Sequence, residues 1–434
     1  MIQGSRGATV LVGMDGFVVG AQEVIDGELW LFVETTTDVT GCPSCGTRAV
    51  GHGRSRTAVR DLPVAGRPTV LAWSKRRWRC SDPDCPMGTW SEATGEIAPR
   101  AVLTERARRR LAEMVNIDGA PIAAAAAVFG VGWHTANQAV ADHTDCHIDD
   151  EGRLDGVRAI GVDEKRFLNA TPTRRTVFTT QIVDLDHNRL LDVIEGRSRD
   201  VLDRWLAHRG DDWCHQIRLA TLDPSAGYRA ALEQHLPQAT LVVDHFHAIR
   251  LANRAIDECR RRVQNHTLGH RGHKRDPLYR ARRVLLTGYE RLTPERFEWM
   301  QSLLATGDPD GEVSACFIAK ELLRDVFAAA DEAHARRRMI TFYLWCADAE
   351  TPELTRLAGT VSRWAEQIFA YHTSGGASNG RVENTHMLAE KTRRTAHGFT
   401  NPTNYRRRLL GRYGIKWHTQ PTARIRGRQP RFIA

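Results

Sequence analysis

Short apolar runs alternate with polar stretches over the first hundred residues. ATVLVG and LWLFVETT, within residues 8–37, are brief and rich in β-branched residues, which predicts strands. A further strand-like run, RPTVLAWSKRRWRC, ends at Cys80. From Thr104 the apolar residues recur at helical spacing in three segments, separated by Gly119–Pro121 and by Gly130–Gly132. The pattern predicts a β-rich start followed by three short helices.

Five β-branched runs follow from Val157. GVRAIGVDE, TVFTTQIVDL and RLLDVIEG come first; helix-like segments then precede IRLATLD and ATLVVD. The resulting β-β-β-α-β-α-β order predicts an α/β sheet and is also the order of the ribonuclease H fold. After Phe246 the pattern is helical to about Tyr371. One more amphipathic helix, THMLAEKTRRTAHGF, precedes a basic end with few core-forming residues.

Charge is unevenly distributed along the chain. The net charge is +9 and the sequence pI about 9.3, which indicates a polyanionic partner. Residues 385–434 carry twelve Arg and Lys against one acid, and residues 42–110 carry fourteen against six. Most of these basic residues are Arg, which suits bidentate contacts with phosphate and guanine, although a GC-rich genome would give the same bias. Basic segments thus flank a near-neutral or acidic middle.

No feature of the sequence indicates a membrane or a secreted protein. No stretch reaches eighteen apolar residues, and the N-terminus lacks the charged start and long apolar core of a signal peptide. The nine cysteines comprise two tight pairs and five single residues. We therefore expect a cytoplasmic protein with one metal site and no disulfide framework.

The two cysteine pairs predict a structural zinc site. CPSC contains Cys42 and Cys45, and CSDPDC contains Cys80 and Cys85. Four thiolates on two short loops suit tetrahedral Zn²⁺ and leave no open position for catalysis. His52 is a less favoured ligand, and four unrelated thiols are the alternative to a metal site. With zinc bound, folding of this module should depend on the metal.

A helix-turn-helix is predicted in AAAAAVFGVGWHTANQAV, whose second helix, Trp133–Val140, would enter the major groove of DNA. Asn and Gln in this helix can pair with adenine. The alternative is a plain helical hairpin packed against its neighbours. The candidate DNA-contacting residues of the whole chain are Arg76, Arg77 and Arg79 beside the cysteines, Trp133, His134, Thr135, Asn137 and Gln138 in this helix, and Arg406, Arg407 and Arg408 near the end.

Three carboxylates stand where a pair of divalent metals would need them. Asp163 and Asp223 close the apolar runs AIGV and IRLATL at expected strand ends, and Glu383 opens a helix after the Gly-rich turn SGGASNGR. Two Mg²⁺ (or Mn²⁺) ions on such residues can hold a phosphate diester for in-line attack, with Asp163 as the bridging ligand. A lone Asp after a strand is more often a loop residue or a helix cap, so the three positions matter only together.

Asp244 is a near-site candidate that competes with Asp223, because it ends the run ATLVVD. We prefer Asp223 as the second ligand, since it follows the fourth strand, which is the usual place in the ribonuclease H fold. His245 and His247, just after Asp244, are interpreted as packing residues or DNA contacts rather than as ligands.

The sequence resembles insertion-sequence transposases of the ISL3 type, which have a DDE catalytic domain. The motifs are CPSC with a later Cys pair, IGVDE, LDPSAGYRAAL, LPQATLVVDHFH and SNGRVENTHMLAEKTRRTAHGF, in order over about residues 40–410. Two local departures, His245 where Arg is common and Asn-Thr after GRVE, involve no carboxylate. Carried onto the matching positions, the resemblance implies the triad Asp163, Asp223 and Glu383.

The resemblance also implies an architecture and an activity. It implies an α/β protein with a ribonuclease H-like catalytic domain, interrupted by an all-helical insertion and preceded by a zinc-ribbon-like module and a helix-turn-helix. It implies metal-dependent cleavage and strand transfer of DNA, binding of inverted repeats and target DNA, and a homodimer or larger synaptic complex. A DNA-binding regulator without catalysis and a nuclease of the ribonuclease H group are the alternatives. The expected divisions are the zinc-binding module (1–98), the helix-turn-helix (99–150), the catalytic domain (151–250 and 372–410), the helical insertion (251–371) and the basic tail (411–434).

Overall fold

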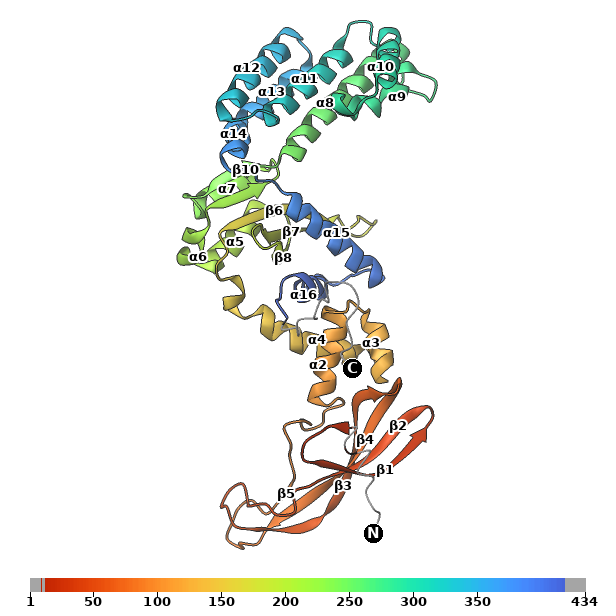
Figure 1. Ribbon diagram of the computed structural model, residues 1–434, viewed down its shortest axis with the longest axis vertical. Helices are drawn as coiled ribbons and strands as arrows, with labels where there is room; N and C mark the ends of the chain where they lie inside the picture. Colours follow the sequence, from red (N-terminus) through yellow and green to blue (C-terminus); the bar gives the residue numbers. More distant parts are fainter. Residues whose placement is uncertain (1–8, 10–11, 418–434) are drawn as a thin grey trace, which may run out of the picture. The chain divides into compact units, whose positions relative to one another are not determined.

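The computed structural model describes residue 9 and residues 12–417, and these form two compact units. The first unit combines the chain up to Arg153 with the chain from Glu390 onward, and the second comprises Leu154–Ala389. Most of the basic tail that the sequence predicts therefore lies outside the described residues. In Figure 1 the first unit contains a twisted sheet and a group of helices, whereas the second contains a sheet with helices beside it and a helical bundle.

A five-stranded sheet begins the first unit. β1 (Phe17–Ile25), β2 (Glu28–Thr35), β4 (Arg67–Cys80) and β3 (Ala49–Val64) lie side by side in that order, and β5 (Thr89–Ser91) pairs with β4. Two-residue turns, Asp26–Gly27 and Ala65–Gly66, join the two hairpins, and all four turn residues have positive φ. Such turns match the twist of the strands that they connect.

The start of this sheet differs from the sequence-based expectation in one place. The first strand among the described residues begins at Phe17; of the run ATVLVG, only Thr9, Val12 and Gly13 are described, and Thr9 and Val12 are helical. The core explains where the strand begins: the Phe17 ring packs edge-on against Trp73 of β4, with ring centroids 5.7 Å apart, and Val33 of β2 is buried beside them.

Helices form the rest of the first unit. They are α2 (Glu105–Asn116), α3 (Ile122–Phe129), α4 (Trp133–Ile148) and α16 (Pro402–Tyr413). Thr104 caps the start of α2 by accepting a hydrogen bond from the backbone of Ala107. Gly130 ends α3 with φ of +63°, a conformation that favours glycine, and α4 starts three residues later. The three short helices predicted from the sequence are confirmed.

α16 lies in a part of the chain that we expected to be a basic end with few core-forming residues. Tyr405, Leu409 and Leu410 are buried where α16 packs on α2 and α4. Arg408 is only 4% exposed and donates hydrogen bonds to the carbonyl oxygens of Val115 and Ala120. Counting positive charge missed this helix because some of its arginines satisfy backbone groups inside the protein instead of facing water.

The second unit contains a mixed five-stranded sheet, and its five strands were all predicted. The strands are β6 (Ala159–Leu168), β7 (Val177–Asp184), β8 (Arg189–Glu195), β9 (Leu219–Leu222) and β10 (Thr240–Val243). Their spatial order is β10-β9-β6-β7-β8; β10, β9 and β6 are parallel, and β6, β7 and β8 are antiparallel. The short helix η1 (Glu151–Leu154) precedes β6, and the connections between strands contain α5 (Arg199–Arg209), α6 (Asp211–Gln216) and α7 (Ala226–His235).

Helices cover both faces of this sheet. On one face Tyr228 of α7 is fully buried and its hydroxyl lies 2.7 Å from that of Thr180 in β7. On the other face α15 (Gly380–Thr395) approaches β6 so closely that a Cβ on Gly161 would clash with Cγ2 of Val382. Because side chains alternate along a strand, Asp163 lies on the same face as Gly161, towards α15.

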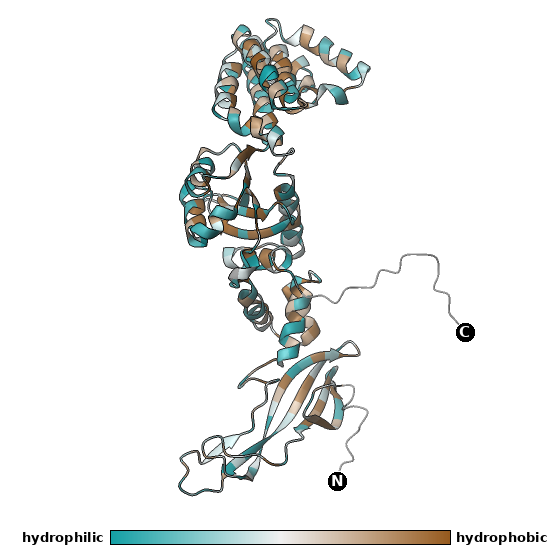
Figure 2. Ribbon diagram, turned by 60° about the vertical axis from the view of Figure 1, so that its left-hand side comes forward, coloured by the Kyte–Doolittle hydropathy of each residue, from teal (hydrophilic) through white to brown (hydrophobic). Residues whose placement is uncertain are grey.

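Between β10 and α15 the chain is helical. The elements are α8 (His245–Leu268), α9 (Pro277–Ala281), η2 (Val284–Leu286), η3 (Tyr289–Arg291), α10 (Pro294–Gly307), α11 (Glu312–Phe327), α12 (Glu332–Asp348), α13 (Pro352–Arg363) and α14 (Ala365–Thr373). α11 packs on α8 and α12, and α14 returns to contact β10. Figure 2 shows hydrophobic residues along the sheet of this unit and polar residues on the helices around it. Among the described residues, no helix has the length and apolar character needed to cross a membrane.

Candidate active site

Parallel strands bring three aspartates to one edge of the second sheet. Asp223 directly follows β9, and Asp244 directly follows β10 and caps α8. Asp163, expected at a strand end, instead lies within β6. The parallel pairing of β6 with β9 stops at Val162, whereas its pairing with β7 continues to Leu168. Asp163 is therefore the first residue of β6 beyond its shorter neighbour, which explains why the apolar run AIGV ends there.

His247 lies between the aspartates. Its Nδ1 atom is 2.8 Å from Oδ1 of Asp223 and 3.0 Å from Oδ2 of Asp244. Burial lowers the pKa of His247, but the hydrogen bonds to Asp223 and Asp244 outweigh this effect and raise it to about 10. The imidazole is therefore a cation at neutral pH and offsets the negative charge of the two carboxylates.

Glu383 completes the group from the helical side. It lies in the first turn of α15, as the sequence predicts, and is half-buried. Potential ligand atoms of Glu383, Asp244 and His247 lie within 4.8 Å of one another, and so do those of Asp163, Asp223 and His247. The structure thus brings together all four acidic residues that the sequence singled out, around His247, which was interpreted from the sequence as a packing residue or a DNA contact.

Asp163 is the most strongly perturbed of these acids. It is 5% exposed, and burial together with the negative charge of Asp223 raises its pKa to about 8. His386 of α15 approaches its Oδ2 atom to 3.3 Å, and burial and Lys165 lower the pKa of this histidine to about 4, so that it is neutral. A neutral imidazole gives Asp163 little charge compensation.

The donor set suits a hard divalent cation. Carboxylate oxygens are the ligands that Mg²⁺ and Mn²⁺ prefer. Burial and then the negative charge of Asp223 raise the pKa of Asp163, and a bound cation would oppose both effects by favouring the ionised carboxylate. The other ring nitrogen of His386, Nε2, is buried without a hydrogen-bond partner among the described residues. Two carboxylate pairs beside His247, Asp163 with Asp223 and Asp244 with Glu383, therefore fit a metal site.

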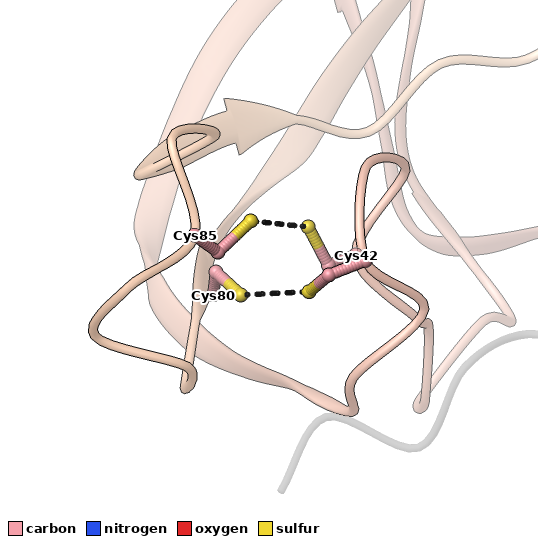
Figure 3. A group of neighbouring side chains, drawn as sticks. Cys42, Cys80 and Cys85 are labelled. Carbon is pink, nitrogen blue, oxygen red and sulfur yellow. Dashed lines mark hydrogen bonds between the residues drawn. The ribbon is translucent and has the colours of Figure 1, made fainter.

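The four paired cysteines converge in the first unit. Figure 3 shows Cys85 facing Cys42, and Cys80 meeting the remaining thiol of the group across a second dashed contact. The Sγ atoms of Cys42 and Cys85 are 3.7 Å apart, and those of Cys45 and Cys80 are 3.5 Å apart. Four sulfurs at about 2.3 Å from one tetrahedral zinc ion would lie about 3.8 Å from one another, which is close to this spacing.

The thiols in this group do not ionise alike. Hydrogen bonds from Thr47 lower the pKa of Cys45 to about 6, whereas burial raises the pKa of Cys80 to about 12. Gly46, with φ of +74°, closes the turn that contains Cys42 and Cys45 by donating its backbone N–H to the carbonyl of Cys42. A cation would be required for all four to be thiolates together.

The candidate DNA-contacting residues differ in exposure. Arg77 and Arg79 are exposed, while Arg76 is bonded to Asp38 at 2.9 Å. Trp133 is 44% exposed at the start of α4, and Gln138 is bonded to Asp142 at 2.6 Å. The other candidates on α4 range from exposed (His134) to half-buried (Thr135 and Asn137).

The three candidate DNA-contacting arginines of α16 differ in burial and in their partners. Arg406 is half-buried and has partners of its own. Arg407 makes a bidentate pair with Asp145 of α4, with both distances 2.7 Å. Arg408 is buried against the carbonyls described above. At least two of these side chains are thus engaged inside the first unit.

Sequence reasoning missed Asn379 and His386, which both contact carboxylates, and it interpreted His247 only as a packing residue or a DNA contact. Asn379, just before α15, is fully buried and donates to Oδ1 of Asp223 at 3.2 Å. The spacing of Asp244 and His247, three residues apart across a helix start, was a usable signal for His247. No local signal marks Asn379, because its contacts are with residues far away in the sequence.

Comparisons with known proteins identify the family of this chain. A family model described as a transposase, of the ISL3 type, matches residues 160–409, and one described as a zinc-finger of the transposases IS204, IS1001, IS1096 and IS1165 matches residues 38–85. The transposase for insertion sequence element IS1001 of Bordetella parapertussis is 22% identical over 375 residues, which cover 86% of this chain and 88% of that protein. The first match spans more than half of the chain and includes every acidic residue of the site. The protein therefore belongs to the ISL3 family of transposases.

Proposed function

We propose that this transposase cuts DNA at the ends of an insertion sequence and joins them to target DNA, with Asp163, Asp223 and Glu383 as its catalytic triad. The observation that carries the proposal is the convergence of these acids, from β6, the end of β9 and the first turn of α15, around His247. They are separated by up to 220 positions in the sequence, so their meeting is a property of the fold.

The sheet supports a ribonuclease H-like interpretation of the second unit. Three antiparallel strands, β6 to β8, are followed by two strands parallel to β6, in the spatial order β10-β9-β6-β7-β8. On this interpretation the helices α8–α14 are an insertion between the last strand and the helix that carries Glu383. The insertion would contact DNA or a second subunit.

The surroundings of the two competing aspartates favour Asp223 as the second ligand. Asp244 is 2% exposed; its Oδ1 accepts from the backbone of Asn379 at 2.9 Å, and its Oδ2 accepts from the backbone of His247 at 3.2 Å. Burial raises the pKa of Asp244, but the hydrogen bonds from His247 and Asn379 lower it overall. Asp244 therefore caps α8 and anchors the turn before α15, whereas Asp223 keeps a 17% exposed side chain for a ligand.

Asp163, Asp223 and Glu383 would hold two Mg²⁺ (or Mn²⁺) ions. When bound, the metals supply activation of the attacking water or 3′-hydroxyl and stabilisation of the leaving oxygen. The protein's own residues anchor Asp223, bury Asp163 and supply positive charge through His247. The 8% exposed His247 would balance Asp223 and Asp244 while the acids are not occupied by metal.

The first unit would supply DNA binding. We propose that Cys42, Cys45, Cys80 and Cys85 hold one structural Zn²⁺, supported by their sulfur spacing and by the zinc-finger match. The α3–turn–α4 segment would act as a helix-turn-helix that reads the inverted repeats, with Trp133 and His134 at its exposed start. Two element ends must be held together, so a dimer or larger complex is expected.

The test is a set of conservative substitutions in the full-length protein. Asp163→Asn, Asp223→Asn and Glu383→Gln should each abolish cleavage of a labelled element end in Mg²⁺, because each removes a charged metal ligand. Binding of the same DNA should persist. Asp244→Asn is the matched comparison, and it should reduce activity through lower stability rather than abolish it. Cleavage that survives Asp163→Asn would disprove the assignment.

A second assay separates a transposase from its two rivals. A transposase should join the cut end to plasmid DNA, whereas a nuclease of the ribonuclease H group would cut without joining. A DNA-binding regulator would do neither.

A further inference from the structure

Asn379 contacts β6, β9 and the residue that follows β10. It is 0% exposed and lies four residues before Glu383. Its side-chain Nδ2 donates to the carbonyl oxygen of Val162 in β6, at 3.3 Å, and to Oδ1 of Asp223 after β9, at 3.2 Å. Its backbone N–H donates to Oδ1 of Asp244, after β10, at 2.9 Å.

The same residue also begins the helix that carries Glu383. The backbone carbonyl of Asn379 accepts a hydrogen bond from the N–H of Glu383, at 2.9 Å. One residue therefore links the peptide next to Asp163, the side chains of Asp223 and Asp244, and the backbone of Glu383. Among the described residues these contacts span sequence separations of up to 217 positions.

The neighbours of the amide determine which way it points. The carbonyl oxygen of Val162 and the ionised carboxylate of Asp223 can only accept hydrogen bonds. The NH₂ group of Asn379 must therefore face them. The hydroxyl of Thr221 donates to Oδ1 of Asn379 from the other side. The amide cannot be turned over without losing these bonds, and it adds no charge to the acidic group.

We propose that Asn379 is a positioning residue that sets the spacing of the metal-binding carboxylates, and so the affinity of the site for divalent cations, without binding a cation itself. This inference rests on the proposed triad. Asn379 acts through Asp223, whose Oδ1 it holds together with His247, and through Glu383, whose helix it starts. Residues that orient metal ligands in this way typically change metal affinity by about 10–100-fold when they are replaced.

The first experiment measures Mn²⁺ binding to full-length, DNA-free protein from the electron paramagnetic resonance signal of free Mn²⁺. Asn379→Ala should weaken Mn²⁺ binding by about 10–100-fold. Ser378→Ala is the matched control: Ser378 is the preceding residue, and its hydroxyl accepts from the N–H of Gly380 and has no recorded contact with a carboxylate. It should change Mn²⁺ affinity less than twofold.

A second substitution tests the route and guards against misfolding. Thr221→Val removes the hydroxyl that orients the amide but keeps the shape of the side chain, and Thr221→Ser retains the hydroxyl. Thr221→Val should weaken Mn²⁺ binding, Thr221→Ser should not, and Thr221→Val should have little further effect in the Asn379→Ala protein, because both changes act on one contact. If Asn379→Ala does not fold, the Thr221 pair decides the question alone.

Two outcomes separate this inference from the proposed function. If Asp223→Asn abolishes Mn²⁺ binding and cleavage, but Asn379→Ala and Thr221→Val leave Mn²⁺ affinity within twofold, the positioning role is wrong and the triad stands. If Asp223→Asn changes neither Mn²⁺ binding nor cleavage, the triad itself is wrong, and the positioning role falls with it.

Discussion

Adding a single methyl group at Gly161 should loosen the helix that carries Glu383. Gly161 lies in β6, two residues before Asp163, and faces α15. A Cβ at this position would clash with Cγ2 of the fully buried Val382, would lie 2.9 Å from Cδ2 of Leu185 and would lie 3.1 Å from the hydroxyl of Thr221. Val382 cannot easily turn away, because a β-branched side chain has few accessible rotamers in a helix.

The expected size of the effect follows from two opposing terms. Gly→Ala at an unstrained position usually stabilises a protein by about 0.4–1 kcal/mol, since it restricts the unfolded chain. Overpacking a filled core costs about 1–3 kcal/mol. The second effect should win, with a net loss of about 0.5–2 kcal/mol, and the thermal midpoint of a domain of this size falls by about 2–4 °C for each kcal/mol.

The assay compares Gly161→Ala with Gly359→Ala by thermal unfolding and by the rate of DNA cleavage. Gly359, in α13, has no atom within 4 Å of an added Cβ and lacks a positive φ, so its substitution should raise the midpoint. Gly161→Ala should lower the midpoint and also slow cleavage, because Val382 precedes Glu383. Combining it with Val382→Ala should cost less than the sum of the two single changes. A midpoint that rises for Gly161→Ala as it does for Gly359→Ala would refute the packing argument.

Three further outcomes are expected. Cys85→Ser should reduce the zinc content measured by atomic absorption from one ion per chain to near zero, and should unfold the first sheet around β4; full zinc occupancy would contradict the cysteine assignment. In buffer without divalent metal, the unfolding midpoint should fall as pH rises from about 4 to about 8. Burial and Asp223 raise the pKa of Asp163 from its ordinary 3.8 to about 8 in the folded protein. The folded state therefore binds this proton more tightly than the unfolded state, and the stability that the proton provides at low pH is lost as pH rises through the folded-state pKa. Asp163→Asn should flatten that slope, and an unchanged slope would exclude Asp163 as its source. Finally, Arg77→Ala should lower the slope of log binding constant against log salt concentration, for DNA binding, by about one unit. Arg408→Met should instead reduce stability and leave that slope unchanged, because Arg408 donates to carbonyl groups inside the protein. Equal slopes for both variants would contradict this distinction.

The sequence was most informative where local pattern and function coincide. The five β-branched runs became β6–β10, because a strand buried between helices must be apolar over its whole length. The cysteine pairs were recognisable because the two residues of each pair lie close together in the sequence. Asp223 and Asp244 were predicted at strand ends because a polar residue directly after a buried apolar run marks the edge of the sheet.

The remaining features depend on contacts between distant segments. Asp163 was expected to end a strand, but β6 extends past it because β7 continues to pair where β9 has stopped. The many arginines of α16 led us to expect an exposed basic tail there. In the structure, however, Arg407 pairs with Asp145 of α4, and Arg408 donates to the carbonyl of Val115 in α2. The contacts of Asn379 could not be predicted, because they join residues that only the folded chain brings together, whereas the local signal for His247 beside Asp244 was present but was not used.

The long separation between β10 and α15 has a consequence for synthesis of the protein. When the ribosome has made β6 to β10, three aspartates are already present, yet Asn379 and Glu383 are still more than a hundred residues away. Long-range contacts of this kind form late in folding, because the loop that they close must first be ordered. A nascent or truncated chain can therefore carry the sheet and first helices of the first unit without the complete set of proposed catalytic residues. On the proposed function, competence to break DNA would be acquired only by chains that have been synthesised past Glu383.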